Sequence, residues 1–428
     1  MLKTKELIEK IEGGAFDEKL CELYVCKKDG CKAFAERFKN LIASYTSCFG
    51  ESEELGLFSA PGRTEIGGNH TDHQHGAVLA ASVNLDVIAA AAPNGSDIIR
   101  IQSEGYPLDE IDLNDLSPKA DEENQAKALI RGVAAKFAEM GYKLSGFNAY
   151  TTSNVLKGSG LSSSAAFEVL VGVIINNLYC GGTVSDIEIA KIGQYSENVY
   201  FGKPSGLMDQ MASSVGSIVS IDFEDTAKPQ VNKIEFDFPK TGHALCIIDS
   251  GADHADLTPE YAAIPTEMKA IAGHFGKDWL RQVPKADVMA NIEKLRASYG
   301  DRAVLRAIHF YNDHNRAISE ADALRNGEFD KFLNIAKESG FSSYMYLQNV
   351  NVKGATDNQP VGYVLALCDE LLGGRGAFRV HGGGFAGTVQ AFVPLDILDE
   401  FKSKIENAVG EGCCHILSIR PVGGTCIA

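Results

Sequence analysis

The sequence predicts an α+β protein of two domains, on three observations. Its 428 residues are enough for two or three domains, at roughly 100 to 200 residues each. Apolar runs of strand length alternate with longer stretches that have apolar residues at helical spacing. A Pro93-Asn94-Gly95 turn between two strand-like runs predicts an antiparallel hairpin, which favours α+β over a doubly wound parallel sheet.

The first half of the chain is expected to contain a helical extension and a mixed domain. Residues 31–47 have apolar side chains at helical spacing, so we expect residues 1–50 to be a helical extension packed on the first domain. Residues 51–235 form the predicted N-terminal domain. Strands are predicted there at 77–83, 87–92, 98–101 and 147–152, and helices at 127–140 and 165–178.

The second half, residues 236–428, is the predicted C-terminal domain. A strand at 244–249 opens it, and a long helical pattern follows at 301–324. Alternating segments at 388–393 and 414–419 predict its last strands.

The charge balance indicates which partners the protein avoids. With 40 basic and 57 acidic side chains, the formal net charge is −17, and such a surface repels nucleic acid and anionic lipid. No apolar run reaches the roughly 18 to 20 residues of a membrane span, and residues 1–12 lack the apolar block of a signal peptide. We therefore expect a cytoplasmic protein that binds neither nucleic acid nor membrane.

Ten cysteines are too few for a disulfide scaffold in a chain of this length, and a reducing compartment predicts mostly free thiols. Cys21, Cys26 and Cys31 form the only regular cluster. Their spacing lies at the long limit for structural zinc, and no second ligand pair follows nearby, so zinc stays the alternative to ordinary thiols.

A glycine-rich segment at residues 61–76 places charged and polar side chains beside an apolar run. Such side chains reduce stability unless they meet a polar ligand, so the segment predicts a binding site. Two alternatives stay open: a solvent-exposed loop and, because three histidines and an aspartate lie here, a metal site.

A second glycine-rich segment, residues 157–166, lies between a strand and an apolar helix. Glycines let the backbone approach a ligand, and the start of a helix presents unpaired N–H groups and a positive dipole end. The segment therefore predicts phosphate binding, with an ordinary serine-capped helix as the alternative. It is not a Walker A loop, because no Lys-Ser or Lys-Thr pair closes it.

A third glycine-rich segment, residues 381–387, begins His-Gly-Gly-Gly and leads into a strand. Lipases and esterases have a similar run at an oxyanion hole, but the chain has no Gly-x-Ser-x-Gly nucleophile elbow. The segment is therefore expected to be a loop beside the phosphates or a plain tight turn.

Two carboxylates, Glu197 and Asp209, flank a glycine- and proline-containing turn. Either one could be a surface charge. Asp209, however, lies among Leu207, Met208 and Met211, and a carboxylate buried in such surroundings needs a charged or hydrogen-bonding partner.

Taken in order, these segments resemble the motif set of the family that unites galactokinase, homoserine kinase, mevalonate kinase and phosphomevalonate kinase, the GHMP kinases. The segment at Pro61 is similar to the galactokinase signature Gly-Arg-x-Asn-x-Ile-Gly-Glu-His-Thr-Asp-Tyr, residues 158–166 to the phosphate loop, and residues 381–387 to the third glycine motif. The resemblance covers the chain from about residue 55. It implies a ribosomal protein S5 domain 2-like N-terminal domain, a ferredoxin-like C-terminal domain and an active site in the cleft between them.

The resemblance also implies the reaction and the residues. With Mg²⁺ as cofactor, ATP would phosphorylate the C1 hydroxyl of D-galactose, giving ADP and α-D-galactose 1-phosphate. Asp209 matches the catalytic aspartate that takes up or orients the hydroxyl proton, Arg63 the arginine beside it, and Ser164 and Glu197 the magnesium ligands. The predicted sugar contacts are Asn69, His70, Asp72, Gly206 and Tyr261. The predicted ATP-binding residues are Gly158, Ser159, Gly160, Leu161, Ser162, Ser163, Ser164 and Ala165.

Several departures from the pattern concern the sugar. Asn69 replaces the glutamate of the signature and His73 its tyrosine, and residues 262–265 replace the family's Asn-x-Arg-Arg run after Tyr261. The alternatives are therefore a sister kinase for N-acetylgalactosamine, L-arabinose or a uronic acid, and a non-catalytic sugar sensor on the same fold. We expect a monomer or a weak homodimer.

Overall fold

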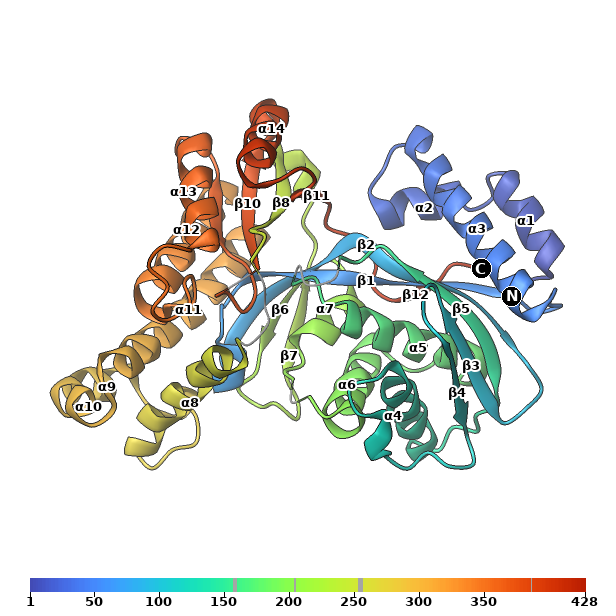
Figure 1. The fold of residues 1–428 in the computed structure, drawn as a ribbon, viewed down its shortest axis with the longest axis horizontal. Helices are drawn as coiled ribbons and strands as arrows, with labels where there is room; N and C mark the ends of the chain where they lie inside the picture. The colour runs from blue at the N-terminus through green and yellow to red at the C-terminus, as the bar shows by residue number, and fades with distance from the viewer. Residues whose placement is uncertain (157–159, 204, 253–256, 386) are drawn as a thin grey trace.

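The computed structural model describes residues 1–156, 160–203, 205–252, 257–385 and 387–428. It contains two antiparallel-rich sheets, each covered by helices (Figure 1). A layer of three N-terminal helices lies on one face of the larger sheet, opposite the helices that cover its other face (Figure 1). Both chain termini lie beside this layer (Figure 1).

The larger sheet has eight strands within the described residues, in the order β12-β1-β2-β5-β3-β4, with β6 and β7 paired beside β2. Every neighbouring pair is antiparallel except β3 with β5, which is parallel. The strands are β1 (Gly56–Gly67), β2 (Ala77–Pro93), β3 (Ile98–Ser103), β4 (Leu108–Asp112), β5 (Phe147–Ser153), β6 (Ile218–Asp222), β7 (Gln230–Ile234) and β12 (Thr425–Cys426).

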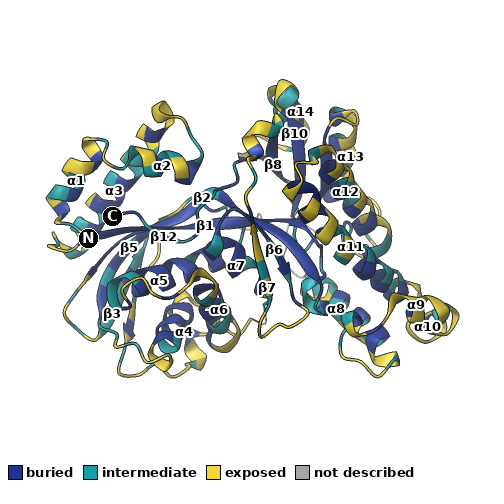
Figure 2. Ribbon diagram, turned by 180° about the vertical axis from the view of Figure 1, so that it is seen from behind, coloured by how far each residue is buried: buried dark blue, intermediate teal, exposed yellow. Residues whose placement is uncertain are grey.

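Helices cover both faces of this sheet (Figure 1). On one face lie α4 (Ala126–Glu139), α5 (Ser163–Tyr179), α6 (Asp186–Ser196), the π-helical turn η4 (Glu197–Phe201) and α7 (Met208–Val215). On the other lie α1 (Thr4–Glu12), α2 (Asp17–Tyr24) and α3 (Cys31–Phe49). Helix α5 is apolar nearly all round and is buried between the sheet and its neighbouring helices, as expected for such a sequence (Figure 2).

The smaller sheet has the order β11-β8-β10-β9 and is antiparallel throughout. Its strands are β8 (His243–Asp249), β9 (Ala377–Val380), β10 (Thr388–Pro394) and β11 (Cys414–Leu417). The helices of this half are α8 (Thr258–His274), α9 (Lys285–Ala290), α10 (Ile292–Tyr299), α11 (Asp301–Arg325), α12 (Phe329–Ser342), α13 (Pro360–Leu372) and α14 (Leu398–Val409), with the π-helical turn η7 (Ser343–Leu347) after α12.

One apolar core connects the two sheets. It contains Phe58 and Ile101 from the larger sheet, Ile247 and Phe392 from the smaller one, and Phe332 from α12, all buried. Strand β7 of the larger sheet ends at residue 234, and β8 of the smaller sheet begins at residue 243. Strand β12 nevertheless returns to the larger sheet, so the last residues of the chain pack with its first half.

The predicted hairpin across residues 93–95 is wrong, because β5 lies between β2 and β3. The chain just before β5 fills the place that the second hairpin strand would take. The Asn94 N–H donates to the Gly146 carbonyl at 3.1 Å, and the Gly146 N–H donates to the Ser96 carbonyl at 2.6 Å. A Cβ atom on Gly146 would come within 2.3 Å of the Ile98 carbonyl oxygen, so only glycine fits this approach. The α+β prediction is confirmed all the same.

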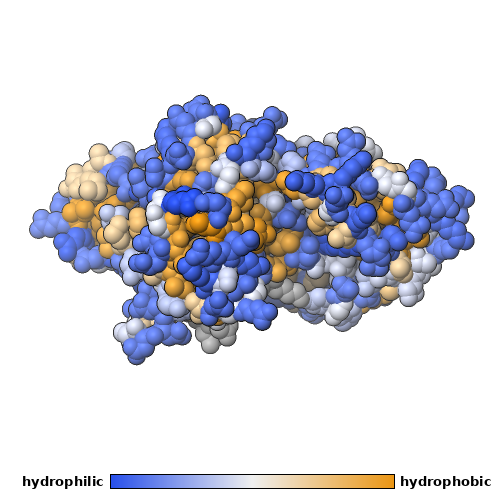
Figure 3. Space-filling model, turned by 90° about the horizontal axis from the view of Figure 1, so that it is seen from above, coloured by the Kyte–Doolittle hydropathy of each residue, from blue (hydrophilic) through white to orange (hydrophobic). Residues whose placement is uncertain are grey.

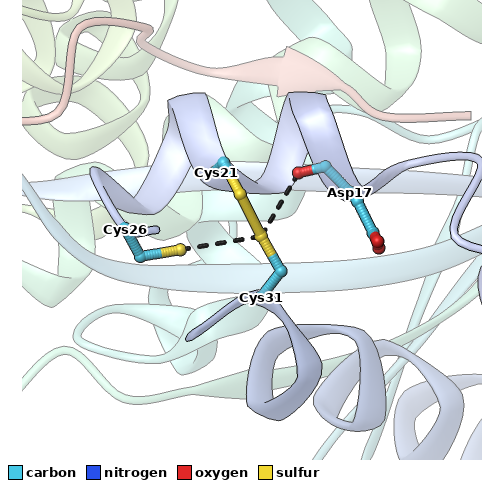
Figure 4. The surroundings of a disulfide bond; sticks show 4 residues. All are labelled: Asp17, Cys21, Cys26 and Cys31. Atoms are coloured by element: carbon cyan, nitrogen blue, oxygen red, sulfur yellow. Dashed lines mark hydrogen bonds between the residues drawn. A yellow bond between two sulfur atoms is a disulfide. The ribbon is translucent and has the colours of Figure 1, made fainter. Parts of the chain in front are cut away.

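The cysteine cluster lies in the N-terminal helical layer. Cys21 and Cys31 form a disulfide that joins α2 to α3, with Cα atoms 5.9 Å apart, and the Cys26 sulfur lies 3.8 Å from that of Cys31 (Figure 4). The expectation of free thiols is therefore wrong for this pair. Within the described part of the chain these three cysteines are the only group with the spacing of a metal site. Zinc binds thiolates, however, and two of the three sulfurs are oxidised.

The surface seen from above is mostly hydrophilic, with apolar side chains gathered near the middle of that face (Figure 3). Among the helices of the described residues, none combines the length and the apolar character that crossing a membrane requires.

Candidate active site

Arg63 lies in β1 where the strand is irregular. The register to β2 shifts between Pro61 and Arg63 and again between Glu65 and Gly67, and such bulges redirect side chains. A Cβ atom on Gly62 would come within 2.9 Å of the Leu161 carbonyl oxygen, and the Arg63 N–H donates to that oxygen at 2.9 Å. The strand is thus joined directly to the predicted phosphate loop.

Arg63 and Asp209 form a two-pronged ion pair. The Arg63 Nε donates to Asp209 Oδ1 at 2.6 Å and its Nη2 to Oδ2 at 2.5 Å. The remaining Arg63 nitrogen donates to the carbonyl of Gly160. Asp209 is the second residue of α7, where the helix dipole favours a negative charge. The predicted catalytic pair is therefore brought together from positions 146 residues apart.

The Asp209 carboxylate is held in its ionised form. Burial alone would raise its pKa, but the Arg63 guanidinium, together with a hydrogen bond from Ser162, lowers the pKa below its usual value. At neutral pH this side chain can accept a hydrogen bond or a proton from a hydroxyl group placed beside it.

Asp72 lies close to this pair, in the short turn η2 (Asp72–Gln74) after β1. One of its carboxylate oxygens would be 2.6 Å from a Cβ atom on Gly206, so glycine at 206 leaves the room that Asp72 occupies. Burial raises the pKa of Asp72, and the nearby negative charge of Asp209 raises it further. Two predicted sugar contacts, Asp72 and Gly206, thus touch each other near the predicted catalytic pair.

The predicted phosphate loop leads into α5, which begins at Ser163. Ser162 has a φ of +54°, a left-handed conformation that is uncommon outside glycine. The first turn of the 17-residue helix α5 offers the free N–H groups that anion binding requires. Gly158 and Ser159 lie outside the described residues. Of the remaining predicted ATP contacts, Leu161 and Ala165 are buried apolar residues.

The two predicted magnesium ligands lie side by side. The Ser164 hydroxyl is 3.4 Å from Glu197 Oε1, and the Lys203 ammonium is 3.1 Å from the same oxygen. The other Glu197 oxygen accepts a hydrogen bond from the Ser205 hydroxyl at 2.6 Å. A hydroxyl and a carboxylate are hard oxygen donors of the kind that Mg²⁺ prefers alongside phosphate oxygens, so this pair fits the ion.

Glu168 is a site residue that the sequence analysis missed. Gln210 Nε2 donates to Glu168 Oε2 at 2.9 Å and to Glu197 Oε2 at 2.8 Å, so one amide joins both carboxyl groups. Burial, and then the negative charge of Glu197, raise the pKa of Glu168 well above its usual value. A signal was present, because Glu168 is the only charged residue in α5.

The third glycine segment packs against the predicted sugar contacts of both halves. His70 Nε2 donates to the Gly383 carbonyl at 3.1 Å, and the Tyr261 hydroxyl donates to the Gly384 carbonyl at 2.9 Å. A Cβ atom on Gly383 would come within 2.6 Å of the Tyr261 ring. On its other side, His381 lies 3.1 Å from the Cβ position of Gly160. The turn therefore connects the predicted sugar contacts with the predicted phosphate loop.

Two histidines of the first segment pack against each other. His73 Nε2 lies 3.3 Å from His70 Nδ1, and the two rings pack against each other. Burial lowers the pKa of His70 to about 4 and that of His73 well below its usual value. Both rings are therefore neutral at physiological pH, and within the described ranges no metal-like group of ligands includes them.

Comparison with known proteins gives a consistent result. The family model "GHMP kinases N terminal domain" matches residues 128–217, and "Galactokinase galactose-binding signature" matches residues 43–93. A galactokinase from Streptomyces coelicolor is 30% identical over 377 residues, which cover 87% of this chain and 91% of that protein. A galactokinase from Glaesserella parasuis is 28% identical over 370 residues, covering 83% and 90%.

Solved structures agree on the fold. The galactokinase of Lactococcus lactis, solved in complex with galactose, superposes with a TM-score of 0.78 at 23% identity and covers 91% of this chain and 99% of its own. The mevalonate kinase of Methanococcus jannaschii superposes with a TM-score of 0.61 at 13% identity, covering 86% and 98%. The protein thus has the GHMP kinase fold, and its chain belongs to the galactokinase family.

Proposed function

We propose that the protein is an ATP-dependent kinase that phosphorylates the C1 hydroxyl of D-galactose. The observation that carries this proposal is the ion pair of Arg63 with Asp209 next to the start of α5. It places a carboxylate and a guanidinium beside a helix end suited to phosphate, in a chain of the galactokinase family.

In the proposed reaction the C1 oxygen of the sugar attacks the γ-phosphorus of ATP. The new oxygen–phosphorus bond forms as the bond to the β–γ bridging oxygen breaks, and ADP leaves. Asp209 takes up the hydroxyl proton, for which its ionised state suits it. Arg63 keeps that carboxylate in place and stabilises the negative charge on the transferring group.

Ser164 and Glu197 are the proposed ligands of Mg²⁺, and Gln210 and Ser205 hold the Glu197 carboxylate in position. When bound, the ion supplies positive charge that offsets the charge of the phosphates. The proposed ATP contacts are the described residues Gly160 to Ala165, whose glycine and helix start present N–H groups to the phosphates.

The sugar contacts are proposed from the same arrangement. Asp72 accepts hydrogen bonds from sugar hydroxyls beside Gly206, and its contact with Gly206 near Asp209 supports this role. His70 and Tyr261 are the further proposed sugar contacts, and both donate to the third glycine segment, at the Gly383 and Gly384 carbonyls. Because these contacts come from both halves of the chain, they also support a cleft between domains that divide near residue 235.

The rival functions make different predictions in one experiment. A coupled assay with ATP and Mg²⁺ would compare D-galactose, N-acetylgalactosamine, L-arabinose and D-galacturonate. We expect the highest kcat/KM for galactose. A higher kcat/KM for another sugar would assign the protein to a sister kinase, as the changes at positions 69 and 73 allow. Failure to turn over any of the four would favour the sugar sensor.

The proposed enzyme acts in the cytoplasm, where its cosubstrate ATP is made, as a monomer or weak homodimer. A net charge of −17 supports a weakly associating surface, because like-charged molecules repel one another. Analytical ultracentrifugation at low and physiological salt tests the solution state, and a dimer that persists at nanomolar concentration would contradict it.

A further inference from the structure

The Asn69 side chain uses its full hydrogen-bonding capacity inside the protein. Its Nδ2 donates to Glu65 Oε1 at 2.9 Å and to the Gly382 carbonyl at 2.7 Å. Its Oδ1 accepts from the Ser343 hydroxyl at 3.2 Å and from Asn349 Nδ2 at 2.9 Å. A primary amide has two donors and two main acceptor positions, so none is left for a ligand.

Asn69 is also inaccessible, with 0% of its surface exposed. Its backbone is held as firmly as its side chain. The Asn69 N–H donates to Asp313 Oδ2 at 2.8 Å, and its carbonyl accepts from His309 Nε2 at 2.9 Å. A residue in this state cannot also serve as a sugar contact, which is the role that the family signature implies for position 69.

This chain has a carboxylate at position 65 and not at position 69, where the galactokinase signature has its glutamate. The signature has asparagine at position 65 and glutamate at position 69, whereas this chain has Glu65 and Asn69, so the two side-chain types are exchanged. Glu65 is buried and pairs with Arg379 at 2.7 Å. Glu65 is thus paired with the Arg379 guanidinium, and the Asn69 amide contacts the glycine turn at the Gly382 carbonyl.

The turn at Gly382 and Gly383 depends on this amide. The Asn349 side chain, which donates to Asn69, also donates to the Gly383 carbonyl at 3.2 Å. The backbone carbonyl of Asn349 accepts a hydrogen bond from the Phe385 N–H. The Gly383 carbonyl is the acceptor for His70, and Gly383 supports the Tyr261 ring. We call Glu65, Asn69, Asn349 and the carbonyls of Gly382 and Gly383 the Asn69 clamp.

We propose that Asn69 is a positioning residue, which fixes the Gly382–Gly383 turn and through it His70 and Tyr261, and so sets the affinity for the sugar without touching it. This inference rests on the proposed function for the identity of the ligand. The clamp itself rests on the contacts alone.

The test compares Asn69→Asp with Ser343→Ala in the full-length protein. Asn69→Asp keeps the shape but removes both donors, so the Gly382 carbonyl loses its partner and a second carboxylate faces Glu65. Ser343→Ala is the matched control, because it also removes a buried hydrogen bond to Asn69 but leaves the glycine turn untouched. Should Asn69→Asp not fold, Asn69→Ala removes the donors without adding charge.

We expect Asn69→Asp to raise the sugar KM by about tenfold or more, with kcat and the ATP KM changed by less than about threefold. Ser343→Ala should leave the sugar KM within about twofold. An equal rise in both KM values, the same effect in the two variants, or an unchanged sugar KM in folded Asn69→Asp would overturn the proposal.

Amide hydrogen exchange gives a readout that needs no activity. Asn69→Asp should speed exchange at the Phe385 N–H, which bonds to Asn349, whereas Ser343→Ala should not. If the parent protein phosphorylates none of the sugars, the proposed function fails while the exchange result still decides the clamp. Unchanged exchange in Asn69→Asp would refute the clamp even in an active galactose kinase.

Discussion

Both oxygens of Asp209 accept hydrogen bonds from the Arg63 guanidinium. Substitution of Asp209 is therefore the most direct test of the proposed mechanism. Asp209→Asn keeps the shape but cannot take up a proton, so we expect kcat to fall by about 10²- to 10⁴-fold. The sugar KM should change far less, because the proposed sugar contacts lie at other residues. Steady-state kinetics measure both constants, with the exposed Asp121→Asn as the control. Retention of full turnover would remove Asp209 from the proposed mechanism.

Glu320 is a buried carboxyl group, and among the residues that the structure describes neither of its oxygens has a hydrogen-bond partner. It lies against Gly67, where a Cβ atom would overlap its carboxylate. Burial raises the pKa of Glu320 well above its usual value. A group whose pKa is higher in the folded state stabilises the fold below its unfolded pKa, near 4.3 for Glu, and that contribution is lost as the pH rises through the folded pKa.

Glu320→Gln removes this titration without changing the shape. At pH 8 we expect the variant to unfold at higher urea concentration than the parent, by at least about 1 kcal/mol in the free energy of unfolding, and at pH 4.5 the difference should nearly vanish. The exposed Glu328→Gln serves as the control. A difference of the same size at both pH values would show that the carboxyl group is not held neutral by burial.

The sequence predicted some of these side chains and could not predict others. Arg63 and Asp209 were predicted because each lies in a motif whose order along the chain is informative. The partnership of Glu65 with Arg379 spans 314 residues, and neither residue lies in a pattern that indicates the other. The same holds for Glu320 beneath Gly67, since only the folded chain brings them into contact. Glu168 could have been found as the lone charge in an apolar helix.

Among the elements, helices were predicted closely because their periodicity is local. The patterns at 31–47 and 301–324 correspond to α3 and α11, which end at residues 49 and 325. Strand neighbours depend on distant segments, so the insertion of β5 between β2 and β3 could not be read from a turn signal. The two runs at 77–83 and 87–92 also join into the single strand β2.

The N-terminal helical layer is tied to the larger sheet through Asp86 of β2. This buried carboxylate accepts hydrogen bonds from Tyr24 of α2 at 2.7 Å, from Arg37 of α3 at 2.5 Å and from Arg420 near the C-terminus at 3.2 Å. Burial alone would raise the pKa of Asp86, but Arg37 and Arg420 lower it below its usual value. Asp86 therefore stabilises the fold above an unfolded pKa near 3.9, and this contribution is lost as the pH falls through the lower folded pKa.

Asp86→Asn leaves the buried Arg420 and the largely buried Arg37 without a counter-charge. We expect a loss of about 3 to 5 kcal/mol in the free energy of unfolding at pH 7, measured by urea titration. The turnover of the remaining folded enzyme should match the parent, because this layer lies on the face of the sheet opposite α5 and α7 (Figure 1). The exposed Glu54→Gln is the control, and a loss below about 1 kcal/mol would contradict the role of Asp86.

At the scale of the whole molecule, the two halves share one core, and both contribute residues to the candidate active site. The apolar core contains side chains from both sheets, β12 returns from the C-terminus to pair with β1, and the Asn69 clamp joins residues more than 300 positions apart. Two domains connected in this way are expected to unfold together, since neither can lose its structure without exposing the apolar surface of the other.

The single tryptophan allows that expectation to be tested. Trp279, in the second half, stacks on His75 of the first half with ring centroids 4.4 Å apart, so its fluorescence reports on the contact between them. We expect fluorescence and far-ultraviolet circular dichroism to give one coincident urea transition. ATP with Mg²⁺ at about 100 times its Kd should raise the free energy of unfolding by about 2.7 kcal/mol by both probes. If the two halves unfolded independently, circular dichroism would show two urea transitions and fluorescence would follow only one of them. The nucleotide would then shift only one of the two transitions.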